Sequence, residues 1–314
     1  MRTYLDFEKE IADLEGKVEE LKHMAVTADV NIVSEIETLQ AKATQKISSI
    51  YSNLGAWQTV KVARHPDRPH FKDYVHGMIT DFTPLAGDRK FGEDEALIAG
   101  FGRFRGRSVA IMGQEKGFDT ESRMKHNFGS ARPEGYRKAQ RVMEMAERFE
   151  MPILSLIDTA GAYPGVGAEE RGQAEAIAKG IEIGLRVKTP FMSVVIGEGG
   201  SGGAIAIATA DKVYMLENSI YSVISPEGCA SILWRSADFS KNAAEALKLT
   251  AKDLLEFGVI DKIIAEPLGG AQRGKEQTIL NVADTLSEGL MELDAMSVEE
   301  LVIARGEKFL KIGR

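Results

Sequence analysis

The chain has 314 residues and a formal net charge of −8 at pH 7, with 44% hydrophobic and 27% charged residues. That composition is typical of a globular protein with a sizeable core, and its acidity argues against broad nucleic-acid binding. The single cysteine, Cys229, excludes a disulfide framework or a CxxC zinc module and fits a reducing, cytoplasmic setting. No apolar run is long enough to span a membrane, and the charged opening MRTYLDFEKEIADLEGK does not resemble a signal peptide.

Residues 1–55 predict two helices that form an antiparallel hairpin. Apolar residues recur at helical spacing from Phe7 to Leu21 and again from Ile36 to Leu54, and Ser34 with Glu37 forms a capping-box pattern. The hairpin either packs on the main body or serves as an arm that docks a partner chain. The heptad-like spacing is too short to establish a coiled coil.

Residues 56–95 are rich in Pro, Gly and charge, and we expect a connector with a short helix around Asp73 to Thr80. Three histidines fall in this segment, namely His65, His70 and His76. They raise the possibility of a metal site, but none shows HxxxH spacing. Solvated loop histidines are the favoured interpretation, and we predict no metal on this chain.

A regular alternation of strands and helices follows, and we expect an α/β domain over 96–270. Two early strands are predicted on either side of a turn at Arg105-Gly106. Later segments predict helices over 134–150 and 169–186, and strands over 152–158, 191–196, 212–216, 220–224 and 259–264. Residues 271–314 predict two C-terminal helices, one over 276–293 and one capped by Ser297 with Glu300.

A basic segment interrupts this acidic chain. Between Phe101 and Arg141 there are ten Lys and Arg residues against four Asp and Glu residues. The segment is either a solvated face or a surface for an anionic ligand, such as a phosphate-bearing cofactor, or for an acidic partner.

The most informative stretch is FMSVVIGEGGSGGAIAIAT, residues 191–209. It predicts a buried strand, a glycine turn over 197–203 and a helix that begins after it. A second glycine turn, TAGAYPGVG over 159–167, follows the preceding strand. Turns at the carboxyl ends of neighbouring parallel strands lie side by side, at the edge where α/β proteins bind ligands.

Four interpretations fit the glycines. A GxGxxG dinucleotide pattern runs from Gly197 to Gly202, but such a pattern usually opens its domain. A GxSxG hydrolase pattern centres on Ser201, yet no histidine lies downstream of it. A P-loop is rejected because the required Lys-Ser/Thr pair is absent. In the fourth, the backbone N–H groups of Gly202 and Gly203 form an oxyanion hole.

Several long peptides together carry a family resemblance. They are DTAGAYPGVGAEERGQ (158–173), VIGEGGSGGA (195–204), YSVISPEGCASILW (221–234), LGAWQTVKVARHPDRP (54–69), NFGSARPEGYRKA (127–139) and the LDFE opening. The chain resembles, over essentially its whole length, the carboxyltransferase α-subunit family of bacterial acetyl-CoA carboxylase, within the crotonase superfamily. The resemblance implies a crotonase-like fold of repeated ββα units with an active site formed between two subunits.

The resemblance also implies the reaction and the partners. A carboxyl group would pass from carboxybiotin, held on the biotin carboxyl carrier protein, to acetyl-CoA, giving malonyl-CoA for fatty acid synthesis. The partners would be a carboxyltransferase β subunit in an α2β2 assembly and a biotin carboxylase, in an ATP-binding complex of the cytoplasm. Zinc is expected only on the β subunit, and the isolated α chain is expected to be inactive.

The same resemblance assigns site residues. Gly202 and Gly203 match a glycine pair whose N–H groups stabilise the biotin ureido oxygen, and the biotin anion would then act as base. The neighbouring turn, Gly161, Ala162, Tyr163, Pro164 and Gly165, would shape the site, and Gly199, Gly200 and Ser201 would contribute to substrate binding. Two alternatives remain open: another crotonase-type acyl-CoA carboxyltransferase or hydratase-like enzyme, and a non-catalytic docking subunit.

Overall fold

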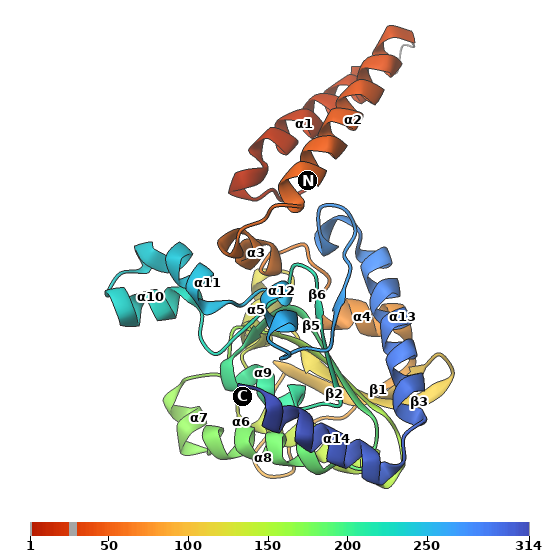
Figure 1. Cartoon of the computed structure of the whole chain (residues 1–314), viewed down its shortest axis with the longest axis vertical. Coiled ribbons are helices and arrows are strands. Elements are labelled where there is room, and N and C mark those ends of the chain that lie inside the picture. The colour runs from red at the N-terminus through yellow and green to blue at the C-terminus, as the bar shows by residue number, and fades with distance from the viewer. Residues whose placement is uncertain (1, 25–29, 314) are drawn as a thin grey trace.

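A computed structural model of the chain describes residues 2–24 and 30–313 (Figure 1). Its centre is an eight-stranded sheet with the order β1-β2-β3-β4-β5-β6-β8, and β7 pairs with β5. The strands are β1 (Ile79–Pro84), β2 (Leu97–Phe104), β3 (Arg107–Gln114), β4 (Ile153–Thr159), β5 (Phe191–Gly200), β6 (Lys212–Leu216), β7 (Ile220–Ser222) and β8 (Lys262–Ile264). Strands β1 to β3 are antiparallel and all later pairs are parallel. The predicted α/β fold class is confirmed.

The β2–β3 hairpin turns where the sequence predicts it. Arg105 and Gly106 both have positive φ, at 50° and 83°. This is the backbone geometry of a two-residue hairpin turn, which glycine at the second position favours.

Helices cover both faces of the sheet. One face is packed by α6 (Pro133–Arg148), α8 (Gln173–Arg186), α9 (Ser201–Ala208) and α12 (Ala251–Glu256), and the other by α4 (Phe71–Met78) and α13 (Lys275–Asp294). Strands β4 and β5 are buried along their whole length because they lie between these layers.

The predicted helical hairpin is present as α1 (Lys9–Met24) and α2 (Val30–Tyr51), which project from the body in Figure 1. The start predicted at Ser34 is wrong, because α2 already begins at Val30 and Ser34 lies inside it. Glu8 and Glu15, at the base of the hairpin, contact Arg273 of the body, with Glu15 Oε1 2.8 Å from Arg273 Nη1. The C-terminal helices are α13 and α14 (Val298–Lys311), and the capping box of Ser297 with Glu300 is confirmed.

The segment expected to be a connector is more structured than predicted. It contains α3 (Ala56–Ala63), α4 and the edge strand β1, which pairs antiparallel with β2. The sequence ITDFTP hides this strand because it is short, mostly exposed and ends in proline, as edge strands can. The division into 1–55, 56–95, 96–270 and 271–314 as separate units stays a prediction.

Two further predictions of local structure need correction. No glycine turn separates β5 from α9: the strand runs through Gly200, and the helix starts at Ser201 instead of after Gly203. The helix expected over 169–186 is two helices, α7 (Val166–Glu170) and α8, because Gly172 between them has φ +80°.

Candidate functional site

The two predicted glycine segments meet at the carboxyl ends of β4 and β5, and their backbones pack against each other. A Cβ atom on Gly200 would lie 2.2 Å from the Ala160 carbonyl oxygen, and one on Gly203 would lie 2.6 Å from the Ala162 nitrogen. Real side chains do not tolerate such distances, so only glycine allows this approach. Both glycines therefore have a packing role that is independent of any chemistry.

The start of α9 leaves backbone donors without protein partners. Ser201, Gly202 and Gly203 occupy its first turn, and no side chain caps it. The first N–H groups of a helix have no intrahelical acceptor and carry the positive end of the helix dipole. Ser201 has φ +50°, a left-handed conformation that allows the strand to turn directly into the helix.

Beside this first turn lies a cavity of about 470 Å³. Its lining comes from β5–α9, β6, β7, the segment 247–259 and the end of α14: Ser201, Gly202, Ile205, Ala208, Val213, Tyr221, Ser222, Val223, Leu247, Leu254, Val259, Phe309 and Ile312. None of these lining residues is an acid, histidine, lysine or arginine. Burial raises the pKa of Tyr221 to about 12, so its hydroxyl stays protonated at neutral pH. Gly203 is buried and does not line the cavity.

Gln114, the last residue of β3, links the start of α9 to β4. Its amide Nε2 donates to the carbonyl oxygen of Gly203 at 3.0 Å, and its Oε1 accepts from the N–H of Asp158 at 3.2 Å. The side chain is fully buried, so these bonds fix α9 relative to β4. Nothing in the local sequence marks Gln114 except its place at the end of a buried strand.

The turn that follows β4 is held by its own hydrogen bonds. The Thr159 hydroxyl bonds both the carbonyl oxygen and the N–H of Gly161, and the N–H of Tyr163 donates to the Ala131 carbonyl. The Tyr163 ring lies under the Arg132 guanidinium, 4.7 Å from ring centre to Cζ. A Cβ on Gly165 would collide with this ring, while Pro164 is exposed. The turn is therefore held in place, and Gly161 and Ala162 lie nearest α9, but none of residues 161–165 lines the cavity.

An ionic network that the sequence does not reveal lies at the same strand ends. Arg64, which follows α3, binds Glu198 through Nε and Nη2 at 3.0 and 2.6 Å, and binds Glu227 at 2.7 Å. Lys116 lies 2.6 Å from Asp158. Burial lowers the pKa of Arg64, but its hydrogen bonds and charge contacts with Glu198 and Glu227 outweigh this and raise it. The only sequence feature that hints at this network is the presence of polar residues at the ends of β4 and β5.

Two further observations concern the histidines and possible metal ligands. No histidine contacts Ser201 among the recorded contacts: His126 bonds the Glu95 carbonyl through Nδ1 and meets Lys72 Nζ through Nε2. Within residues 2–24 and 30–313, no group of His, Cys, Asp and Glu side chains is placed to hold a metal ion. In the same ranges, no helix has both the length and the apolar character needed to cross a membrane.

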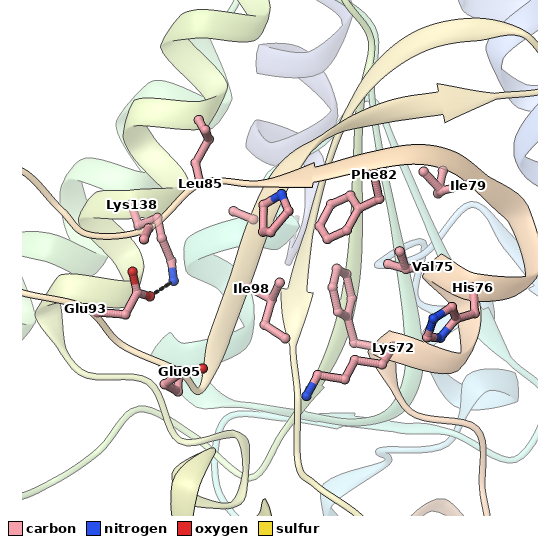
Figure 2. Close-up of a pocket in the computed structure, with 14 residues that line it drawn as sticks. Lys72, Val75, His76, Ile79, Phe82, Leu85, Glu93, Glu95, Ile98 and Lys138 are labelled. Carbon is pink, nitrogen blue, oxygen red and sulfur yellow. Dashed lines mark hydrogen bonds and ion pairs between the residues drawn. The ribbon is translucent and has the colours of Figure 1, made fainter.

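A cavity of about 620 Å³ lies elsewhere, between α4, α6 and the first two strands (Figure 2). Phe82 and Ile98 point into it from β1 and β2, and Lys138 at its rim contacts Glu93. None of the predicted site residues lines this cavity, so its size alone does not make it the active site.

Comparisons with known proteins decide the family. A family model described as "Acetyl co-enzyme A carboxylase carboxyltransferase-like" matches residues 4–313. The chain belongs to this carboxyltransferase family. It is 59% identical over 311 residues to a protein of Rhodospirillum centenum named acetyl-coenzyme A carboxylase carboxyl transferase subunit alpha, covering 99% of this chain and 98% of that one. It is 60% identical to the protein of the same name from Rhizobium rhizogenes, covering 100% and 99% of the two chains.

Two solved structures share the fold of this chain. The transcarboxylase 12S structure aligns over 69% of this chain and 42% of its own, with 22% identity and a TM-score of 0.55. A Pseudomonas malonate decarboxylase hetero-tetramer in complex with coenzyme A aligns over 69% and 86%, with 14% identity and a TM-score of 0.57. The sequence-based resemblance to the carboxyltransferase family and its crotonase-like fold is confirmed.

Proposed function

We propose that this carboxyltransferase is the α subunit that transfers the carboxyl group of carboxybiotin, carried on a biotin carboxyl carrier protein, to acetyl-CoA to form malonyl-CoA. The observation that carries this proposal is the open first turn of α9 beside a cavity without acid or base side chains. Such a site supplies main-chain donors to a developing negative charge and little else.

The residues present fit the ring system of biotin. The cavity wall is apolar, with Ile205, Val213 and Phe309 among its members, while Gly202 lies at its edge with a free backbone donor. Carboxybiotin supplies the carboxyl group. The chain would bind the ring against the apolar wall, exclude water, and place the N–H group of Gly202 toward the ureido oxygen. Gly203, which is buried and does not line the cavity, stays the predicted second donor.

An exposed apolar surface lies next to this cavity. Helix α10 (Pro226–Trp234) and helix α11 (Ser240–Leu247) form a projection on one side of the molecule (Figure 1). Large apolar side chains are exposed on or beside it, with exposed fractions of 78% for Val223, 70% for Ile232 and 66% for Leu233. Trp234, exposed at 41%, stacks on Phe239. Exposed aliphatic and aromatic groups of this density mark protein interfaces.

We propose that the β subunit covers this projection. Val223 belongs both to the exposed group and to the cavity lining, so a subunit seated there would close the cavity. The α2β2 stoichiometry, the zinc on the β subunit, the carrier protein, the biotin carboxylase with its ATP, and the cytoplasmic location belong to the same proposal. Their support is the family membership and, for the location, the single cysteine.

The hydratase-like alternative needs paired glutamates near the donors. Glu198 is instead held by Arg64, and Glu169 and Glu170 are exposed on α7 and do not line the cavity. A docking subunit without chemistry would make no use of donors at the start of α9, so substitution there separates it from the enzyme.

The test removes one donor and leaves the rest of the turn in place. Gly202 is the second residue of α9, where proline is tolerated because its missing N–H has no helical partner. Proline strains a preceding residue with the left-handed φ of Ser201, so Ser201→Gly is the background and Ser201→Gly with Gly202→Pro is the test. Each variant is combined with the β subunit, and the biotin-dependent decarboxylation of malonyl-CoA is measured.

We expect the added proline to lower kcat about 10²- to 10³-fold relative to Ser201→Gly, which is the effect of losing one oxyanion donor. Co-purification with the β subunit should be unchanged. Equal rates in the two variants would show that Gly202 is not a donor. Activity in neither variant nor in the unaltered pair would overturn the proposed reaction.

A further inference from the structure

Another cavity, of about 440 Å³, lies at the end of β4 and is lined by a different set of residues. These come from the end of α3 and the loop after it, from the segment after β3, and from α5 (Thr120–Lys125) and the short helix after it: Ala63, Arg64, His65, Pro66, Arg68, His70, Lys116, Gly117, Arg123, Phe128, Asp158 and Ala160. Four of them are Lys or Arg and one is an acid. We call it the cationic cavity.

Buried nitrogen atoms of two residues that line this cavity lack partners among the described residues. Arg68 is 3% exposed; its Nη atoms bond Glu266 and the Ile196 carbonyl, but its Nε has no hydrogen-bond partner within residues 2–24 and 30–313. In the same ranges neither ring nitrogen of His70 has one, and Nδ1 lies 3.8 Å from the Glu115 carboxylate. Because nearly all buried polar groups in folded proteins are satisfied, each of these atoms requires an explanation.

Arg123 adds a free charge. Its Nε lies 3.4 Å from the Gly117 carbonyl oxygen, and no ion pair is recorded for it in the described ranges. The other cations are engaged: Arg64 with Glu198 and Glu227, Arg68 with Glu266, and Lys116 with Asp158. The Glu115 carboxylate accepts from the N–H groups of Lys72 and Gly117. The acids that face the cavity are thus already bonded, and Arg123 with the unpartnered nitrogens remains.

Phe128, which lines the cationic cavity, and its neighbour Asn127 have strained backbones. Their φ values are 53° and 45°, which non-glycine residues adopt at a cost that the surrounding structure must sustain. Phe128 is 58% exposed, so part of its ring is open to a ligand.

We propose that the cationic cavity binds a phosphate group, either inorganic phosphate or the phosphate of a larger organic molecule. Nitrogen-bearing side chains from three segments line it, at Arg68, His70 and Arg123, which suits a doubly charged group with several acceptor oxygens better than a planar carboxylate. This site accounts for part of the basic segment that begins after Phe101. It does not depend on the proposed carboxyl transfer, because binding is measured without turnover.

The experiment measures phosphate binding to the full chain by isothermal titration calorimetry. Inorganic phosphate is compared with acetate and chloride at equal ionic strength. The test variants are Arg123→Gln and His70→Gln, and the matched control is Arg103→Gln, which removes a surface arginine of the same basic segment outside the cavity. Thermal unfolding without added anion shows whether each variant is folded.

We expect phosphate to bind more tightly than acetate, and Arg123→Gln and His70→Gln to weaken it about tenfold or more, with Arg103→Gln unchanged. Coenzyme A and dephospho-coenzyme A, which lacks only the ribose 3′-phosphate, then separate the two sources. A difference between them that Arg123→Gln abolishes assigns the site to that 3′-phosphate, and failure of both to displace inorganic phosphate assigns it to a free phosphate compound. Equal binding of phosphate and chloride, or unchanged binding in both test variants, overturns the proposal. Tighter acetate than phosphate binding makes it a carboxylate site and overturns it as well.

Discussion

Two cavities flank the carboxyl ends of β4 and β5, and they use opposite means to present hydrogen-bond donors. The cavity beside α9 has an apolar wall, no charged side chain and free N–H groups of the backbone. The cationic cavity is lined by four Lys and Arg side chains, most of them already paired with carboxylates. The first cavity therefore offers donors of the backbone, and the second offers donors of charged side chains.

The difference teaches how each site is kept rigid. Backbone donors are fixed by helix geometry and by close packing of glycines, so they need no reorganisation when charge appears. Long side chains must be held by partners. The Arg68–Glu266 pair and the bonds of Arg64 serve as a framework, and Arg123 is left with a single long bond, to the Gly117 carbonyl. A transient charge suits the first cavity, and a stable anion suits the second.

The largest stability effect is expected at the framework of the cationic cavity. Arg68→Met leaves Glu266, which is fully buried, without its cation, and breaking such a pair costs about 3–5 kcal/mol of unfolding free energy. Urea denaturation measures this loss. Arg123→Gln is the matched control, expected within about 0.5 kcal/mol of the unaltered chain. Equal effects in the two variants would contradict the division into framework and free donor.

A smaller effect with a pH signature is expected for Glu266→Gln. Burial raises the pKa of Glu266, but the charge of Arg68 and hydrogen bonds from Arg68, Asn218 and Ala271 hold it below its usual 4.5. A carboxylate with a lowered folded-state pKa stabilises the fold above its unfolded pKa and loses that contribution as pH falls. The glutamine variant should therefore be less stable by about 2–3 kcal/mol near pH 7. Denaturation midpoints should converge below about pH 4.5, and a constant difference down to pH 3 would contradict this.

The sequence predicts elements with a local signal. The capping box of Ser297 with Glu300, the turn at Arg105-Gly106 and the buried strand β4 follow from residues close together in the chain. The extension of β5 through Gly200 does not, because it depends on parallel pairing with β7, where Gly200 faces Ser222. The local propensity of residues 197–200 favours a turn, but pairing with a neighbouring strand makes them part of β5.

The site also contains residues that the sequence marks locally and residues that only long-range contacts bring together. Glycine density and the long family peptides mark Gly202 and Gly203, whereas Arg64 reaches Glu198 across 134 positions. Gln114 joins β3 to α9 across 89 positions. Such contacts have no short-range pattern, because only the order of strands in the sheet brings them together. Their residues could be suspected only from their place at strand ends.

The glycines of the first cavity can be compared directly. In Gly203→Ala the new methyl group would meet the Ala162 nitrogen at 2.6 Å and the Gly161 carbonyl carbon at 2.7 Å, both backbone atoms that cannot move aside easily. We expect a loss of about 1–3 kcal/mol in unfolding free energy, as for other overpacked sites. Gly202→Ala meets only the Ile177 side chain, at 3.3 Å, and should cost less. The reverse order would show that the turn of residues 161–165 is not held against α9.

The smallest effect, and one of opposite sign, is expected at a glycine without such a neighbour. Gly306 lies within α14, and a Cβ there would meet nothing within 4 Å. Alanine lowers the entropy of the unfolded chain and favours helix, so Gly306→Ala should stabilise the protein by about 0.5–1 kcal/mol. Because α14 also supplies Phe309 to the cavity wall, the kcat of the α–β pair should stay unchanged if the wall is only a surface for binding. A stabilised variant with lower kcat would instead mean that α14 must move during turnover, and the rigid first cavity would then be the wrong description.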